Sequence, residues 1–215
     1  AYDHSQANRA GDLWRLLSAV EESLPNGLTA QPWHLGGHSM GGGTVAAMAI
    51  QEPSRVQSLV LVDAALSETP RGSGLFAFPP LGRWMMAALE HFLITEDRIK
   101  SLLTSAYGQE PSAAQIDAYL KPLRLPGTAR SLLNVVQTAK NEDPEKLKDI
   151  SVPILAIWGD KDTWIPLEEL DKMTAIRPDI TVRLISGAAH CPMETHPEAF
   201  SAIVLQWLSS HPGTE

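Results

Sequence analysis

The sequence carries a serine with a glycine two residues to either side, in GHSMG at positions 37–41. The run separates an apolar segment over 32–37 from a stretch of small and apolar residues over 40–50. This order favours a strand, a sharp turn and a helix packed closely against a sheet, with Ser39 on the turn. Such a turn exposes the hydroxyl and points helix amide groups at it. Ser39 is therefore a candidate nucleophile, although the same glycines could simply let a helix pack against a sheet.

A serine hydroxyl needs a base to become a nucleophile, and the base needs a carboxylate that orients it. Asp162 follows the apolar segment 154–158, and His190 follows the apolar segment 182–185. If both segments are strands of one parallel sheet, their carboxyl ends share an edge of that sheet. We therefore expect Ser39, Asp162 and His190 to converge there.

Other residues compete for these roles. Asp160 is the second candidate for the acid, and Asp63 ends another apolar segment, where it is either an alternative acid or a partner of loop amides. We expect the pleat to aim His38 away from Ser39, which gives it a structural role. Cys191 directly follows the candidate base, but a small buried thiol is favoured over a nucleophile. The remaining histidines belong to no motif: His4, His34, His91, His196 and His211.

The elements that must position these residues alternate along the chain. Helical spacing of apolar residues predicts helices over 13–24, 40–50 and 167–176, and a last helix that ends near Leu208. Thr195 and Glu198 have the spacing of a capping box at the start of that last helix. Strands are expected over 32–37, 58–65, 153–158 and 181–185. The fully apolar strands are typical of a parallel sheet covered on both faces, so the sequence predicts an α/β fold with a mostly parallel sheet flanked by helices.

A segment between the second and third expected strands has a different character. Residues 67–145 are helical in pattern, interrupted by glycines and prolines, and too apolar for a linker. We therefore divide the chain into a core, residues 1–66 and 146–215, and an inserted helical segment, residues 67–145. Aromatic residues of this segment, Phe76 and Trp84 among them, can form local core or face a cleft, and we expect both.

The sequence resembles the α/β-hydrolase superfamily, and within it the capped serine esterases and lipases. The resemblance extends from near Leu13 to near Leu208 and rests on GHSMGG (37–42), LVLVDA (59–64), ILAIWGDKDTWIP (154–166) and GAAHCPMETHPEAF (187–200). By position it implies that Ser39 is the nucleophile, Asp162 the acid and His190 the base. It also implies that the Met40 amide stabilises the oxyanion and that the inserted segment is a cap.

The resemblance implies a serine hydrolase that cleaves carboxylic esters or related acyl compounds through an acyl-serine intermediate. Trp164 and Ile165, just past the acid, are expected to line the substrate pocket with Phe76 and Trp84. The expected substrate is a small ester or acyl molecule, and the chemistry requires neither a metal nor a cofactor. Two alternatives remain: a carbon–carbon bond hydrolase or perhydrolase with the same triad, or a ligand-binding module without catalysis.

The composition excludes several other classes. The 215 residues include 17 Lys and Arg against 25 Asp and Glu, a net charge of −8 that argues against nucleic-acid binding. A hydrophobic content of 44% is typical of a folded globular protein. The single cysteine excludes an intramolecular disulfide and slightly favours the cytoplasm. No apolar run approaches the roughly 18 residues that a membrane span needs.

In the superfamily, further strands precede the nucleophile, whereas the sequence before residue 32 has room for one helix. We therefore expect the chain to be the carboxyl-terminal part of a longer hydrolase. If this chain is all that exists, the second oxyanion donor is missing, which lowers a rate by about 10²–10³, and we expect low activity. The strand over 32–37 would form a bare apolar edge, and we expect self-association through it.

Overall fold

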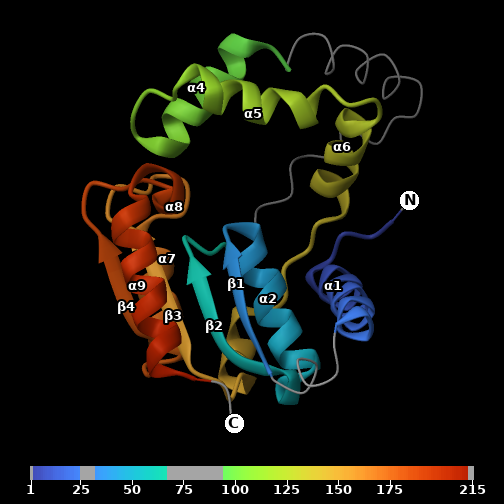
Figure 1. Cartoon of the computed structure of the whole chain (residues 1–215), viewed down its shortest axis with the longest axis vertical. Helices are drawn as coiled ribbons and strands as arrows, with labels where there is room; N and C mark the ends of the chain where they lie inside the picture. Colours follow the sequence, from blue (N-terminus) through green and yellow to red (C-terminus); the bar gives the residue numbers. More distant parts are fainter. Residues whose placement is uncertain (1, 25–31, 67–93, 213–215) are drawn as a thin grey trace.

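The centre of the fold is a sheet of four parallel strands, in the order β1, β2, β3, β4. The structure is a computed structural model that describes residues 2–24, 32–66 and 94–212 of the chain. Figure 1 shows the strands side by side with their carboxyl ends at one edge. Their bounds are Trp33–His38 for β1, Val56–Val62 for β2, Ile154–Gly159 for β3 and Thr181–Ile185 for β4.

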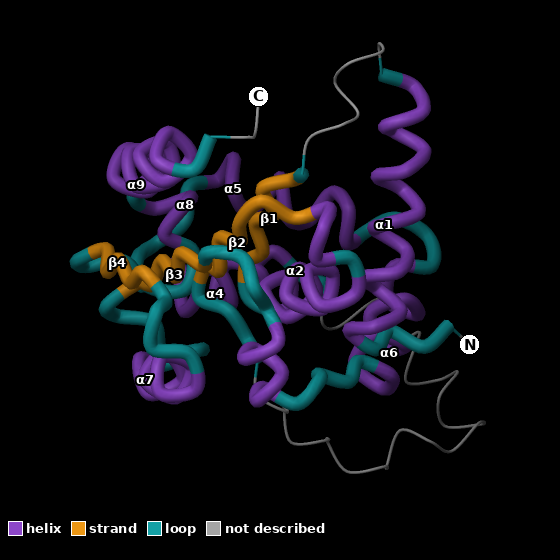
Figure 2. Tube along the Cα trace, turned by 90° about the horizontal axis from the view of Figure 1, so that it is seen from below, coloured by secondary structure: helices purple, strands orange, loops and turns teal. Residues whose placement is uncertain are grey.

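Helices cover both faces of the sheet, as the view along its plane in Figure 2 shows. One face carries α2 (Met40–Gln51) and α7 (Leu167–Ile176), with α1 (Gln6–Ser23) packed outside α2. The other face carries α9 (Pro197–Ser210). Short helical turns complete the core: η1 (Pro53–Arg55), η3 (Pro144–Asp149) and α8 (Pro192–Thr195).

The apolar residues of β2 explain why both faces are covered. Successive side chains of a strand point to opposite faces. Leu59 and Leu61 accordingly pack with α1, α2 and α7, whereas Val60 and Val62 pack against α9. The same alternation holds along β3, whose six residues are all buried. A strand that is apolar at every position therefore needs helices on both sides, which confirms the fold predicted from the sequence.

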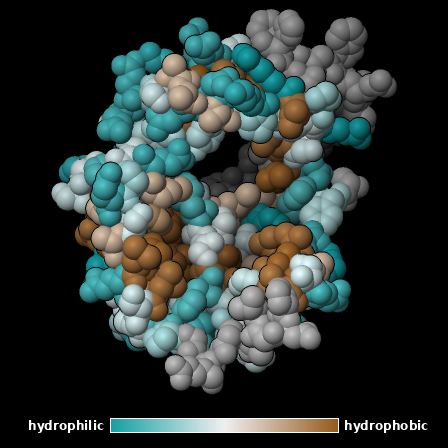
Figure 3. Space-filling view, viewed as in Figure 1, coloured by the Kyte–Doolittle hydropathy of each residue, from teal (hydrophilic) through white to brown (hydrophobic). Residues whose placement is uncertain are grey.

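Among the described residues between β2 and β3, three α-helices follow one another: α4 (Glu96–Tyr107), α5 (Ala113–Leu123) and α6 (Thr128–Thr138). They lie beyond the carboxyl ends of the strands (Figure 1), and α4 and α5 pack against Cys191 and Met193. The space-filling view shows a hollow between part of the inserted segment and the sheet (Figure 3). Gly108 ends α4 in the left-handed conformation, and Ser112 and Gln115 form a capping box at the start of α5. The role of this segment as a cap stays a prediction.

Several boundaries differ from the sequence prediction for local reasons. The first helix starts at Gln6, because the Ser5 hydroxyl accepts the Asn8 amide and caps it. The predicted capping box at Thr195 is wrong: Thr195 lies in α8, and its hydroxyl donates to the Cys191 carbonyl. The last helix instead has His196 as its N-cap, followed by a proline at its first position.

Two predicted pocket residues, Phe76 and Trp84, lie outside the described residues. Among the helices that the structure describes, none has the length and apolar character needed to cross a bilayer.

Candidate active site

Ser39 lies on a strained turn between β1 and α2. Its backbone has φ 51° and ψ −122°, and left-handed φ values are unusual for residues other than glycine. The turn is held by the Ser39 amide, which donates to the Val62 carbonyl over 3.0 Å. It also demands glycine at position 37, because a Cβ there would lie 2.3 Å from the Gly41 carbonyl oxygen. The close approach of strand and helix thus explains the glycine at position 37.

The Ser39 hydroxyl is not used to cap its own helix. A serine before a helix usually accepts a hydrogen bond from an amide of the first turn, but Ser39 makes no such bond. The Met40 amide is the first of α2, so it belongs to the four amides that find no acceptor within a helix. The hydroxyl and this amide are therefore both available at the amino end of α2, where the helix dipole favours negative charge.

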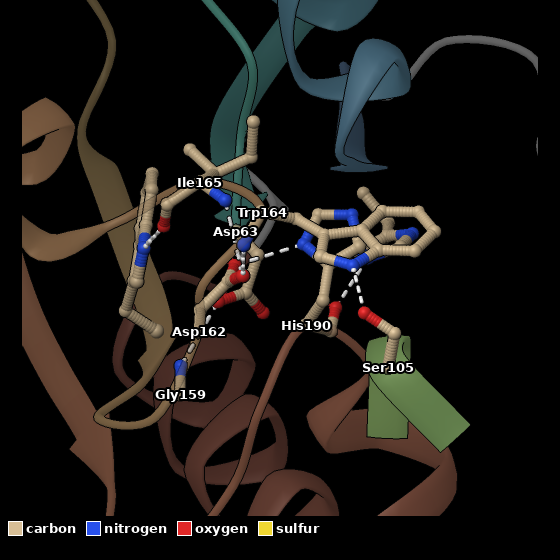
Figure 4. A network of polar contacts seen from close by, with 9 residues as sticks. Asp63, Ser105, Gly159, Asp162, Trp164, Ile165 and His190 are labelled. Carbon is tan, nitrogen blue, oxygen red and sulfur yellow. Dashed lines mark hydrogen bonds and ion pairs between the residues drawn. The ribbon is translucent and has the colours of Figure 1, made fainter. Parts of the chain in front are cut away.

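Asp162 and His190 form a buried pair. The Asp162 Oδ2 atom lies 2.8 Å from His190 Nδ1, and the two residues are 6% and 3% exposed. The other carboxylate oxygen accepts the amides of Trp164 and Ile165 at 2.7 and 3.0 Å (Figure 4). Burial acts to raise the pKa of Asp162, but the bonds from His190 and the two amides outweigh it and lower that pKa. Asp162 is therefore an ionised acceptor that fixes the ring of His190 through Nδ1.

The loops that carry this pair are held together by close backbone packing. The two loops follow the neighbouring strands β3 and β4. The Lys161 amide donates to the Ala188 carbonyl over 2.8 Å. A Cβ at Gly159 would lie 2.2 Å from the Ala189 carbonyl oxygen, so only glycine fits where the two loops touch.

His38 joins the turn that carries Ser39 to His190. Its Nε2 atom lies 2.7 Å from the His190 carbonyl oxygen, and the ring centroids of the two histidines are 4.7 Å apart. Within the described part of the chain, this contact and not a direct hydrogen bond links the Ser39 region to His190. The structural role expected for His38 thus has a specific partner that the sequence did not reveal.

Asp63 lies at the end of β2 beside Asp162. It is fully buried, and its Oδ1 atom accepts the Gly159 amide over 2.9 Å. Burial raises the pKa of Asp63 to about 9, and the neighbouring charge of Asp162 adds to this effect. Asp63 thus bonds to a backbone amide at the end of β3, and its role as an alternative acid stays a prediction.

Two other candidates have different partners. Asp160 accepts the Gly187 amide at 2.7 Å and the Ser186 hydroxyl at 3.3 Å, so it braces the loop that carries the base. Cys191 is buried, and burial raises the pKa of its thiol to about 12, which keeps it protonated.

The predicted pocket residues are only partly placed. Trp164 stacks on His190 with ring centroids 5.1 Å apart, and its indole N–H donates to the Ser105 hydroxyl of α4. Ile165 packs against the main core, so its role as a pocket wall stays a prediction. Ser105 was missed by the sequence, where nothing distinguishes it from other helix serines. It lines an open cavity of about 450 Å³ together with Asp97, Lys100, Ser101 and Thr104.

One group of potential metal ligands occurs among the described residues. Ligand atoms of Asp63, Asp162 and His190 lie within 4.8 Å of one another. However, Asp162 and His190 bond to each other, and the carboxyl group of Asp63 bonds to a backbone amide. The arrangement is that of a hydrogen-bonded network.

The chain belongs to the α/β-hydrolase fold family, whose sequence pattern it matches over residues 4–197. This family assignment agrees with the parallel sheet and with the serine turn at its carboxyl edge. Two relatives are named pimeloyl-acyl-carrier-protein methyl ester esterase. The one from Serratia marcescens is 27% identical, with 98% of this chain and 81% of the relative covered. The one from Yersinia enterocolitica is 28% identical, with 80% and 67% covered.

Solved structures share the fold at lower identity. A meta-cleavage product hydrolase from Pseudomonas fluorescens IP01 has a TM-score of 0.76 at 17% identity, covering 98% of this chain and 74% of that one. A putative aryl esterase from Burkholderia cenocepacia has a TM-score of 0.70 at 16% identity, covering 97% and 72%. These similarities concern the fold alone.

Proposed function

We propose that the protein is a serine hydrolase that cleaves carboxylic esters through an acyl-Ser39 intermediate. The observation that carries the proposal is the buried hydrogen bond between Asp162 and His190. It lies at the same edge of the sheet as Ser39, whose hydroxyl makes no capping bond to α2. The esterase names of the relatives support an ester as substrate.

In the proposed reaction, His190 Nε2 takes the proton of Ser39 while the oxygen attacks the ester carbonyl carbon. Asp162 holds Nδ1–H and stabilises the positive ring that forms. The carbonyl oxygen becomes negative and is stabilised by the Met40 amide at the start of α2. The leaving alcohol takes the proton from His190, and His190 then activates a water molecule that releases the acid and frees Ser39.

The substrate class follows from the relatives only in outline. Their name specifies a methyl ester of an acyl group, so the proposed substrates are acyl esters of small alcohols. A carbon–carbon bond hydrolase, a perhydrolase and a binding module remain alternatives, because a fold does not determine function and this fold is shared with a meta-cleavage product hydrolase.

The decisive experiment combines a covalent probe with a substrate panel. A fluorophosphonate probe should label the protein at Ser39, and methyl and p-nitrophenyl esters of short acyl chains should be hydrolysed. Ser39→Ala should abolish both signals, whereas Ser209→Ala, an exposed serine on α9, should change neither. A vinylogous diketone acid in the same panel tests the carbon–carbon alternative.

Labelling at another serine, or ester turnover by Ser39→Ala, would exclude the proposed nucleophile. Labelling at Ser39 with cleavage of the diketone acid and of none of the esters would exclude the proposed substrate class.

A further inference from the structure

The fully buried Asp63 is held in an unfavourable backbone conformation. Its φ is 41°, and it shares a left-handed φ with Ser39 alone among the described residues other than glycine. Both residues directly follow a strand at the carboxyl edge of the sheet. The Asp63 amide donates to the Ile157 carbonyl, and its Oδ1 accepts the Gly159 amide, so backbone and side chain are both fixed against β3. Strain of this kind persists where the surrounding structure imposes it, and it concentrates at functional sites.

The second oxygen of Asp63 has no conventional partner. Asp63 Oδ2 is buried and accepts no hydrogen bond within the described structure, although it lies beside the Asp162 carboxylate. A buried ionised carboxylate with an unsatisfied oxygen is costly, and a second negative charge nearby increases the cost. Both costs disappear if the pair holds one hydrogen, because a protonated carboxyl group is a donor and an ionised one is an acceptor.

We propose that Asp63 is a positioning residue of the candidate site: a neutral carboxylic acid that donates its hydrogen to Asp162 and holds that carboxylate against His190. Asp162 already accepts two amides and the His190 ring, so it is the better stabilised anion of the pair. Asp63 accepts one amide only, so it is the member that keeps the hydrogen. The proposed role in catalysis rests on the proposed function, whereas the protonation state does not.

The charges around Asp63 agree with this assignment. The titratable groups that face it are Asp162 from the loop after β3, and His190 and Cys191 from the loop after β4. The ring of His38, at the end of β1, lies 4.7 Å from the ring of His190. The negative charge of Glu194 in α8 acts on His38 and on Cys191. The pKa of Asp63 is raised to about 9, chiefly by burial.

The direct test is a pH titration of the protein labelled with ¹³C at the aspartate side-chain carboxyl carbons, followed by NMR. We expect one carboxyl resonance of the buried pair to titrate near pH 9, and we expect Asp63→Asn to remove it. Asp162→Asn should lower its midpoint, because the neighbouring charge is gone. Asp171→Asn, an exposed aspartate of α7, is the matched control and should leave the titration unchanged.

A second measurement uses stability. An aspartate has a pKa near 3.9 when unfolded, so a native state with a raised pKa binds one more proton than the unfolded state between that pH and about 9. The contribution of Asp63 to stability is present at low pH and is lost as the pH rises through the folded pKa. Relative to Asp63→Asn, the unfolding constant of the unmodified protein should therefore rise by up to about tenfold per pH unit between pH 5 and 8.

The positioning role is tested by kinetics. Asp63→Ala should lower kcat for ester hydrolysis about tenfold with a smaller change in KM, and Asp63→Asn should restore most of the loss, since its amide can donate to Asp162 and accept from Gly159. A pair that titrates entirely below pH 5 would overturn the proposal, and so would a pH-independent stability difference from Asp63→Asn. Titration near pH 9 in a protein that fails to react at Ser39 would instead overturn the proposed function and leave the shared hydrogen intact.

Discussion

The imidazole of His38 is bound to the backbone of His190, with 2.7 Å between Nε2 and the carbonyl oxygen. A carbonyl oxygen only accepts, so Nε2 of His38 carries the hydrogen. Burial lowers the pKa of His38, so its ring is neutral at neutral pH and has a single N–H, which this bond uses. The end of β1, directly before Ser39, is thereby tied to His190, the residue proposed as the base for Ser39.

His38 should therefore affect catalysis without touching substrate. His38→Phe keeps a ring but removes the donor, and we expect it to lower kcat about tenfold, the effect of one lost hydrogen bond. His38→Gln supplies an amide donor and should recover part of the loss. The test is to measure kcat and KM for a short ester with the unmodified protein, His38→Phe and His38→Gln. Equal kcat values for all three proteins would show that the bond does not position His190.

The stacking of Trp164 on His190 leads to a second prediction. The face of an indole attracts a cation by about 0.5–1 kcal/mol at exposed positions, and Trp164 is 41% exposed. Because the proposed mechanism makes the His190 ring positive in the transition state, Trp164→Ala should lower kcat/KM about two- to fivefold, and Trp164→Phe should lower it less. Ser105→Ala removes only the bond to the indole N–H and is the control. A larger effect of Ser105→Ala than of Trp164→Ala would contradict the role of stacking.

The strands and helices that were predicted correctly are those that the local spacing of apolar residues specifies. The periods of apolar residues predicted all four strands, and the bounds of α7 and β4 agree with the structure to the residue. Asp162 and His190 were expected to meet, and they do. That expectation needed only the rule that parallel strands end at one edge of a sheet, and not the details of packing. Their catalytic roles, and that of Ser39, stay predictions.

The contacts that the sequence could not predict join distant elements. The bond between His38 and His190 joins residues 152 positions apart in the chain. The side chain of Asp63 accepts the amide of Gly159, 96 positions later. Such contacts depend on the spacing of strands and loops to within an ångström, which residue periodicity does not specify. A signal for Asp63 did exist, because an acidic residue directly after a strand buried on both faces must find a partner.

The GHSMG turn provides a stability prediction with an internal control. A methyl group at Gly37 would meet the Gly41 carbonyl oxygen at 2.3 Å, whereas a methyl group at Gly41 meets nothing within 4 Å. Gly37→Ala should therefore destabilise the protein by at least about 2 kcal/mol, because backbone must shift to make room. Gly41→Ala should be neutral or stabilising by up to about 1 kcal/mol, because alanine favours a helix. Urea unfolding of the two variants measures the difference, and similar losses in both would contradict the close approach.

The choice between two neighbouring aspartates can be tested directly. Asp162→Asn leaves the shape intact but cannot fix the His190 ring as an ionised carboxylate does, and we expect kcat to fall about 10²–10⁴-fold. Asp160→Asn should lower kcat no more than about threefold, because Asp160 bonds to Gly187 and Ser186 and not to the ring. The ester assay at pH 7.5 compares them. A larger loss in Asp160→Asn would reverse the assignment.

The pH dependence of Asp162 has a defined sign. Its pKa lies below the ordinary value, so its contribution to stability is present above pH about 4 and is lost as the pH falls through the folded pKa. In an Asp63→Asn background, which removes the titration of Asp63, thermal unfolding with and without Asp162→Asn should therefore differ by a constant amount above pH 5 and converge below pH 4. Divergence at low pH would mean that the pKa of Asp162 is not lowered.

Glu194 connects the inserted helices to the loop that carries His190. The phenol groups of Tyr107 in α4 and Tyr119 in α5 donate to its two carboxylate oxygens at 2.5 and 2.6 Å. Burial, reinforced by Glu194, raises the pKa of Tyr119 to about 12 and raises that of Tyr107 as well, so both phenols keep their hydrogens at neutral pH. The pair of bonds should therefore hold α4 and α5 against α8.

Glu194→Gln replaces two anionic acceptor oxygens by one neutral oxygen and an NH2 group. Only one of the two phenols can then donate to an oxygen of residue 194. We expect it to lower Tm by about 2–4 °C, the shift produced by about 1 kcal/mol in a chain of this length. KM for esters should rise more than kcat falls, because α4 and α5 would move relative to the site and not the site itself. Glu198→Gln, an exposed neighbour in the first turn of α9, is the control. A double-mutant cycle with Tyr119→Phe isolates the bond, and additive effects on Tm in that cycle would show that Glu194 stabilises the protein by some route other than these phenols.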